Sequence, residues 1–141
     1  MKKTTLLLAT VLSALFANAQ KVKETEVPAP VKTSFEKQYP GIKVEKWEKE
    51  GTNFEAEFDL KKVETSSLFD ANGTMLETET EIKVSELPKG VTDYVTKNLG
   101  GKKIKEASKI VDASSVTTYE AEVDGADYIF DTNGNFIKKS N

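Results

Sequence analysis

The chain contains the same pattern twice. Phe69–Gly73 reads FDANG and Phe130–Gly134 reads FDTNG, 61 positions later. Three further blocks precede them in the same order in both halves: VPAPVKTSF with LPKGVTDYV, YPGIKVEKW with LGGKKIKEA, and FEAEF with YEAEV. Four matching blocks in one order indicate an internal repeat of about 60 residues, and such a repeat predicts two similar structural units.

The spacing between the copies changes along the chain. The offset is 60 residues for the first two blocks, 65 for FEAEF and YEAEV, and 61 for the FD-x-NG pair. We therefore expect extra residues near Asp112–Val116 in the second copy and near Leu60–Glu64 in the first.

Each copy is expected to begin with a helix. Apolar residues recur at every fourth position, as one stripe of an amphipathic helix requires. Pro28 and Pro88 precede these stripes, where a missing N–H group costs nothing, and glycine-containing pairs follow them as helix stops. The stripes are Val31, Phe35 and Tyr39 in the first copy and Val91, Val95 and Leu99 in the second.

The residues after each helix alternate between apolar and acidic side chains. Phe54–Phe58 and Tyr119–Val123 show this period of two, and Leu76–Ile82 repeats it with three glutamates. The pattern predicts antiparallel strands that bury one face of a sheet. The expected fold is α+β, a tandem repeat of a helix plus about four antiparallel strands. The helices should cover the apolar face of these strands.

The FD-x-NG segments have two possible roles. Asn-Gly tolerates positive φ and is typical of a hairpin turn. Alternatively, oxygen atoms of Asp70, Asn72, Asp131 and Asn133 could bind calcium. A calcium loop of the EF-hand type needs its glycine at position six, whereas Gly73 and Gly134 are at position four, which favours a turn.

The amino terminus resembles a secretory signal peptide. Lys2 and Lys3 precede the apolar stretch Leu6–Phe16, and Ala17-Asn18-Ala19 is a small-x-small cleavage site. The apolar stretch is too short to span a bilayer, and no cysteine follows it for lipid attachment. We expect a soluble protein of the periplasm or exterior that begins at Gln20, is not a lipoprotein and has no stable membrane insertion after cleavage.

The expected organisation has four parts. Residues 1–19 are the signal peptide and 20–26 a flexible amino terminus. The first repeat covers 27–86 and the second 87–141.

Composition excludes several functions. The chain has no histidine and no cysteine, so the usual zinc sites and nucleophile–histidine pairs are excluded. The formal charge is −3, and an acidic chain is a poor ligand for nucleic acid. Paired carboxylates alone could hydrolyse glycosides, but no desolvated pocket is evident around them, so we expect no enzymatic activity and no cofactor.

Together, YPGIKVEKWEKEGTNFEAEF, FDANGTMLETE and LPKGV resemble the PepSY-like periplasmic proteins, whose fold is like that of the β-lactamase inhibitor protein (BLIP-like). The resemblance covers about Val27 to Ile137 and implies that the two units form one curved antiparallel sheet with the helices on one face. It implies a non-catalytic module that binds and modulates or inhibits a secreted or envelope protein. The alternative that it leaves open is a calcium- or small-ligand-responsive sensor.

The resemblance supplies no set of functional residues, so the candidates come from strand alternation. The open face of the sheet should carry Glu55, Glu57, Glu120 and Glu122. Counting alternate positions from Val44 places Trp47 on the same face, and tryptophan is common at the centres of protein interfaces. These five residues are the predicted partner-binding site, and the identity of the partner stays open.

Overall fold

The computed structural model describes residues 19–140. The predicted signal peptide, apart from Ala19, lies outside the described residues. Within 19–140, nine strands form one antiparallel sheet in which every strand pairs with its neighbours in sequence. The strands are β1 Gln20–Val22, β2 Lys46–Glu50, β3 Asn53–Leu60, β4 Val63–Phe69, β5 Met75–Ile82, β6 Ile104–Asp112, β7 Thr117–Val123, β8 Ala126–Phe130 and β9 Phe136–Ser140.

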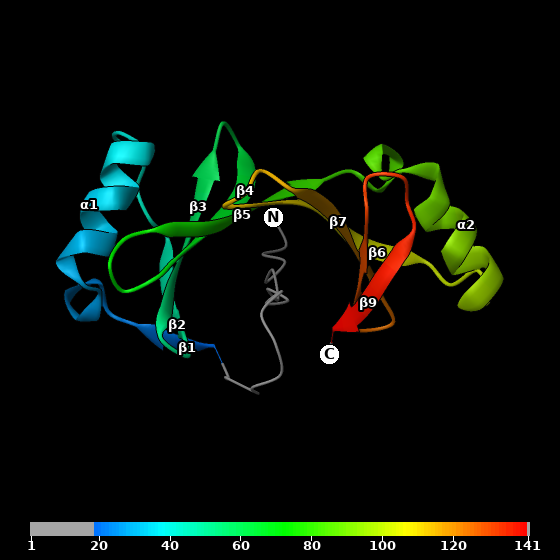
Figure 1. Ribbon diagram of the computed structural model, residues 1–141, viewed down its shortest axis with the longest axis horizontal. Helices are drawn as coiled ribbons and strands as arrows, with labels where there is room; N and C mark the ends of the chain where they lie inside the picture. Colours follow the sequence, from blue (N-terminus) through cyan, green and yellow to red (C-terminus); the bar gives the residue numbers. More distant parts are fainter. Residues whose placement is uncertain (1–18, 141) are drawn as a thin grey trace.

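Two α-helices complete the fold, α1 (Ala29–Gln38) and α2 (Lys89–Asn98), each preceded by a short 3-10 helix. Figure 1 shows the sheet as an arch, with α1 and α2 against its outer side at opposite ends. The predicted α+β fold, with one curved sheet and the helices on one face, is confirmed. No helix of residues 19–140 lies on the inner side of the arch. We call this inner side the concave face; Glu55 and Glu120 lie on it.

The segment 20–26 is not the flexible extension that the sequence suggested. Gln20–Val22 pairs with β2 as an edge strand. The Lys23 N–H then donates to Glu26 Oε2 at 2.8 Å, and the Lys83 N–H donates to Glu86 Oε2 at the same distance in the second half. The repeat therefore begins upstream of Val27. The spacing of Lys23 and Glu26 was present in the sequence and could have revealed it.

Differences in hairpin length explain the changing offset between the copies. The last residue pair of the β3–β4 hairpin is Leu60↔Val63. The corresponding β7–β8 hairpin ends at Val123↔Ala126, two residue pairs earlier in the repeat, so β3–β4 is the longer of the two. The longer hairpin of the second copy is β6–β7. Its turn is closed by Asp112, whose Oδ1 accepts the N–H groups of Ser114 and Val116. Both sites of extra residues agree with the sequence expectation.

Each helix covers its own hydrophobic core, and the two cores are filled differently. In the first, Phe35 contacts Phe58 with ring centroids 5.0 Å apart. In the second, Val95 and Val123 occupy the corresponding positions, and Tyr94 instead stacks on Phe136 at 4.8 Å. The second core thus receives an aromatic ring from Tyr94, one position before Val95, where the first core has Phe35. Phe58 and Val123 are both 1% exposed, which confirms them as inward sites.

The first FD-x-NG segment is a turn between β4 and β5. Asp70 Oδ1 accepts the N–H groups of Asn72 and Thr74, both at 2.9 Å. Gly73 has φ +86°, and a Cβ atom there would lie 2.5 Å from the carbonyl oxygen of Pro30. The turn therefore packs directly on the first turn of α1, at a distance that only glycine permits.

The second copy repeats this contact against α2. Asp131 Oδ1 accepts the N–H groups of Asn133 and Asn135, both at 2.9 Å. A Cβ atom on Gly134 would lie 2.6 Å from the Cα atom of Gly90. Each copy of the motif thus forms a turn that packs closely on the helix of its own repeat, which confirms the hairpin-turn interpretation.

Candidate functional site: the concave face

The concave face collects most of the acidic side chains. The strand register places fourteen of the 23 aspartates and glutamates of the sequence on it. Lys21, Lys46 and Lys138 are the lysines that the register places there. The acidic residues are Glu48, Glu50, Glu55, Glu57, Asp59, Glu64, Glu77, Glu79, Glu81, Glu106, Asp112, Glu120, Glu122 and Asp127.

The four glutamates predicted for this face all lie on it, but two of them are not exposed. Glu55 and Glu120 are 0% and 5% exposed. The side chains of Glu57 and Glu122 are 15% and 17% exposed and pair with Lys46 at 2.7 Å and Lys105 at 3.3 Å. The expectation of freely accessible carboxylates was therefore wrong for the centre of the face.

Trp47 lies on the opposite face, against the sequence prediction. It pairs with Ala56, whose side chain belongs to the α1 core. Its exposure is 6%, and its ring meets Phe35 edge-on at 5.9 Å. The count from Val44 failed because β2 begins only at Lys46, so the preceding residues do not alternate. Trp47 is a core residue and is not positioned to contact a partner on the concave face.

This placement can be checked by fluorescence, because Trp47 is the single tryptophan of the chain. Acrylamide should quench the tryptophan fluorescence of the folded protein several-fold less than that of the urea-unfolded protein, because the α1 core encloses the indole. Equal quenching in the two states would place the indole at the surface.

Sequence reasoning missed two further buried carboxyls, Glu50 and Asp127, which are 6% and 8% exposed. Glu79, one of the three glutamates of the alternating segment Leu76–Ile82, is 1% exposed. Glu50 ends β2, and Asp127 sits one residue into the short strand β8. Neither shows the apolar–acidic alternation that marked the other glutamates, and only the strand register identifies their face.

Several buried carboxyl oxygens lack hydrogen-bond partners. Both oxygens of Glu55 and of Glu79 have none, and neither do Oε2 of Glu50 and Oε2 of Glu120. Buried polar groups in proteins are nearly always hydrogen-bonded, so each such atom needs an explanation.

Burial raises the pKa values of these acids. The pKa of Glu55 rises to about 9, through desolvation first and repulsion from Glu50, Glu57 and Glu79 after it, although the nearby Ser66 hydroxyl opposes the change. Desolvation and mutual repulsion also raise the pKa values of Glu79 and Glu120. These central groups are therefore largely uncharged at neutral pH.

The stability of the protein should consequently decrease as pH rises. An acid whose pKa is higher in the folded state binds more protons when folded, so folding is favoured at low pH and penalised above the unfolded pKa. For Glu55 this window runs from the unfolded value of about 4.5 to about 9, with a slope of up to about 1.4 kcal/mol per pH unit. Urea unfolding at pH 5 to 8 should show a shallower decrease for Glu55→Gln than for the wild type. Parallel decreases would contradict the burial of Glu55.

A protein-family model matches this sequence twice, over residues 15–76 and 61–138. Its description reads "Putative beta-lactamase-inhibitor-like, PepSY-like". The chain belongs to this family. The two matches follow the duplication seen in the sequence, and no curated protein matches the chain.

Solved structures with similar folds come from Bacteroides species. A DUF2874 family protein from Bacteroides uniformis has a TM-score of 0.71 at 20% identity, covering 81% of this PepSY-like chain and 88% of the other. A BLIP-like protein from Bacteroides fragilis has a TM-score of 0.63 at 24% identity, covering 80% and 85%. A Bacteroides eggerthii protein described as "putative periplasmic" has a TM-score of 0.69 at 16% identity, covering 82% and 88%. At these identities the likeness establishes the fold alone.

One group of carboxylates in the described part of this PepSY-like chain is close enough to share a cation. Ligand oxygens of Glu48, Glu55 and Glu57 lie within 4.8 Å of one another. The Lys46 ammonium nitrogen, however, is 3.0 Å from Glu48 Oε1 and 2.7 Å from Glu57 Oε1. A lysine thus already pairs with two of these three carboxylates.

The turn residues named as the alternative calcium ligands serve the backbone instead. The Oδ1 atoms of Asp70 and Asp131 each accept two backbone N–H groups. Hydrogen bonds from the side chain and backbone of Asn135 lower the pKa of Asp131, with smaller contributions from the N–H groups of Asn133 and Gly134. These carboxylates act as turn caps, and calcium binding by Asp70, Asn72, Asp131 and Asn133 stays a prediction.

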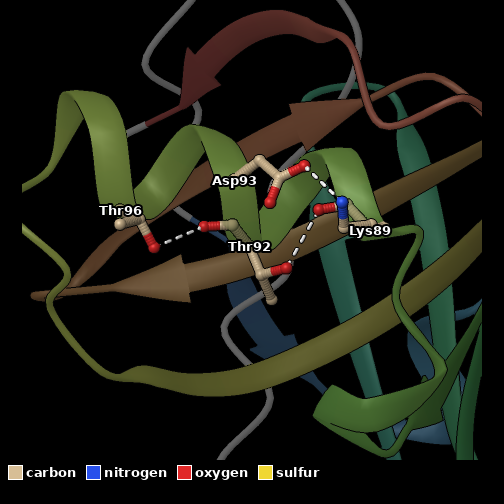
Figure 2. Close-up of polar contacts among 4 residues, drawn as sticks. All are labelled: Lys89, Thr92, Asp93 and Thr96. Carbon is tan, nitrogen blue, oxygen red and sulfur yellow. Dashed lines mark hydrogen bonds and ion pairs between the residues drawn. The ribbon is translucent and has the colours of Figure 1, made fainter.

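A cavity of about 370 Å³ lies between α2 and the start of β6. Its lining includes Thr92, Thr96 and Ile104. Figure 2 shows that the two threonine hydroxyls are used within α2, since Thr92 donates to the Lys89 carbonyl and Thr96 to the Thr92 carbonyl, each at 2.9 Å. The cavity therefore offers a mainly apolar wall with few free polar groups. No sequence pattern pointed to it.

Among the described residues, no helix is long and apolar enough to cross a membrane.

Proposed function

We propose that this PepSY-like chain is a non-catalytic binding module of the periplasm that modulates or inhibits an envelope or secreted protein docked on its concave sheet face. The observation that carries the proposal is the row of buried carboxyls on the one sheet face that has no helix over it. Such groups leave acceptors unpaired, and a bound partner would supply the missing donors. Export of the chain as a mature protein beginning at Gln20 is part of the proposal.

The partner-binding residues of this proposal are Glu55, Glu57, Glu120 and Glu122, without Trp47. Glu57 and Glu122 are only partly buried and each pairs with a lysine, and partly exposed interface charges mainly control the association rate. The more deeply buried Glu55 and Glu120 would contact the partner at the centre of the interface.

The test is affinity capture from an envelope extract with three baits. These are the wild type, the double variant Glu57→Lys with Glu122→Lys, and the control double variant Glu24→Lys with Glu36→Lys on the exposed helix side. Both double variants raise the net charge of the protein by the same amount. We expect one protein to be captured by the wild type and the control and lost from the concave-face variant. Equal loss from both variants would contradict docking on this face.

A second candidate is a calcium-responsive sensor, favoured by the grouping of Glu48, Glu55 and Glu57. In that case millimolar calcium would raise the melting temperature of the wild type by displacing Lys46. The rise would vanish in Glu48→Gln with Glu57→Gln and persist in Asp70→Asn. Calorimetry without a calcium signal would remove this candidate.

A further inference from the structure

We propose that the occupant of the concave face is a cationic polypeptide segment whose lysine or arginine side chains donate hydrogen bonds to the unpartnered carboxyls of Glu55, Glu79 and Glu120. This inference rests on the proposed function and gives its partner a chemical class. Three observations carry it: the unpaired acceptors, the excess of acidic groups on the face, and the spacing of the three carboxyls.

The unpaired acceptors require hydrogen-bond donors. Glu55, Glu79 and Glu120 are at least 95% buried, and five of their six carboxyl oxygens lack a partner. Ammonium and guanidinium groups have donors and no acceptors. Hydrogen bonds between such groups and carboxylates are about twice as strong as neutral ones.

The charge on the face selects a cationic occupant. Fourteen acidic side chains face the interior of the arch, and the register places three lysines there. Of these lysines, Lys46 is already paired with Glu48 and Glu57. An anionic or acidic partner would meet repulsion from the acids of this face that stay ionised, so complementarity favours a basic one.

The spacing of the carboxyls favours a polypeptide over a single ion. Glu55, Glu79 and Glu120 lie on β3, β5 and β7. Backbones two strands apart are separated by about 10 Å, whereas calcium ligands lie about 2.3–2.6 Å from one ion. About 20 Å separates β3 from β7, a length that about six residues of extended chain can span.

Apolar side chains between the acids add a second requirement. Leu68, Ile110 and Ile129 share the concave face and are 7%, 2% and 1% exposed. A segment that also carries aliphatic carbon, as the stems of lysine and arginine do, fits this surface better than a small hydrophilic polyamine.

Binding of such a segment should release protons. A cation stabilises the ionised carboxyl and lowers its pKa, so groups that are protonated in the free protein lose protons in the complex. Affinity therefore increases with pH, tenfold per pH unit for each proton released. The other charged groups of the face also set this response: Lys21, Lys46, Glu48, Glu50, Glu57, Asp59, Glu64, Glu77, Glu81, Glu106, Asp112, Glu122, Asp127 and Lys138, together with Lys105, which pairs with Glu122.

The experiment is isothermal titration calorimetry of the protein purified from cells expressing the full chain. The probe is a twelve-residue peptide of alternating lysine and threonine, compared with glutamine–threonine and glutamate–threonine peptides of equal length. Titrations at pH 6, 7 and 8 in buffers of different ionisation enthalpy give the number of protons released. We expect binding of the lysine peptide alone, with release of one or more protons, and therefore an affinity at least about a hundredfold tighter at pH 8 than at pH 6.

Matched variants separate specific binding from general attraction to an acidic protein. The triple variant Glu55→Gln, Glu79→Gln, Glu120→Gln keeps the side-chain shapes, so it should fold, which its thermal melting checks. It should weaken lysine-peptide binding at least tenfold and reduce the number of protons released, because the three central side chains can no longer ionise. The control Glu24→Gln, Glu36→Gln, Asp93→Asn removes three exposed acids from the helix side and should bind like the wild type. Equal weakening in both triples, or binding of the lysine peptide without proton release, would overturn the proposal.

This result is separable from that of the capture experiment. A captured partner that docks on the concave face through a neutral or acidic surface, with affinity independent of pH, would overturn the cationic occupant and leave the binding module in place. Binding of the lysine peptide with the expected proton release, without any captured protein, would support the cationic chemistry of the face and count against an envelope partner.

Discussion

Replacing Phe58 with alanine should lower the free energy of unfolding by about 3–5 kcal/mol, the usual cost of removing a buried phenylalanine. The ring is 1% exposed and lies between two aromatic side chains of the α1 core. Its centroid is 5.0 Å from that of Phe35 and 4.6 Å from that of Tyr39. Alanine would leave a cavity that α1 cannot fill without moving off the sheet. Urea unfolding monitored by circular dichroism measures the loss.

The neighbouring Glu57→Ala variant is the matched control, since its side chain points to the other face. Its ion pair with Lys46 is partly exposed to solvent, and pairs of this kind contribute at most about 1 kcal/mol. We expect a loss under about 1 kcal/mol. A larger loss for Glu57→Ala than for Phe58→Ala would mean that the faces of β3 are assigned the wrong way round.

The fold could be predicted from the sequence because it depends on local patterns that occur twice. Alternation in FEAEF and YEAEV assigns the two faces of β3 and β7, and the stripe from Val31 to Tyr39 assigns the buried side of α1. The duplicated order of blocks then predicts two equivalent units. These patterns alone could not reveal that β5 and β6 pair directly and join the halves into one continuous sheet, which only the family resemblance implied. That pairing connects the last strand of the first repeat with the first strand of the second, on either side of α2.

The site was predicted less well, because burial depends on curvature and neighbouring strands rather than on alternation. Alternation along the strands placed Glu55 and Glu120 on the correct face, yet it could not show that these side chains are buried. Trp47 was placed on the wrong face because the strand begins later than its apolar neighbour Val44 suggests. The central role of Glu79 also depends on its register partners Ser66 and Ile110, which no single segment contains.

Replacing Gly73 with alanine should lower the free energy of unfolding by about 2–5 kcal/mol. One part is the positive φ of +86°, which costs an L-residue about 1–2 kcal/mol. The other is steric, because the new Cβ atom would lie 2.5 Å from the backbone oxygen of Pro30. Relieving an overlap with backbone typically costs about 1–3 kcal/mol. Urea unfolding of the variant measures the sum.

Gly41→Ala separates these two parts. Gly41 has a similar φ of +73°, but nothing lies within 4 Å of a Cβ atom there. Its variant should therefore lose only the backbone contribution of about 1–2 kcal/mol. The difference between the two variants measures the packing of the FD-x-NG turn on α1, the contact that explains why the chain contains this motif twice. Equal losses would mean that the turn can move away from Pro30 at no cost, and the duplicated glycine would then be required only for its backbone conformation.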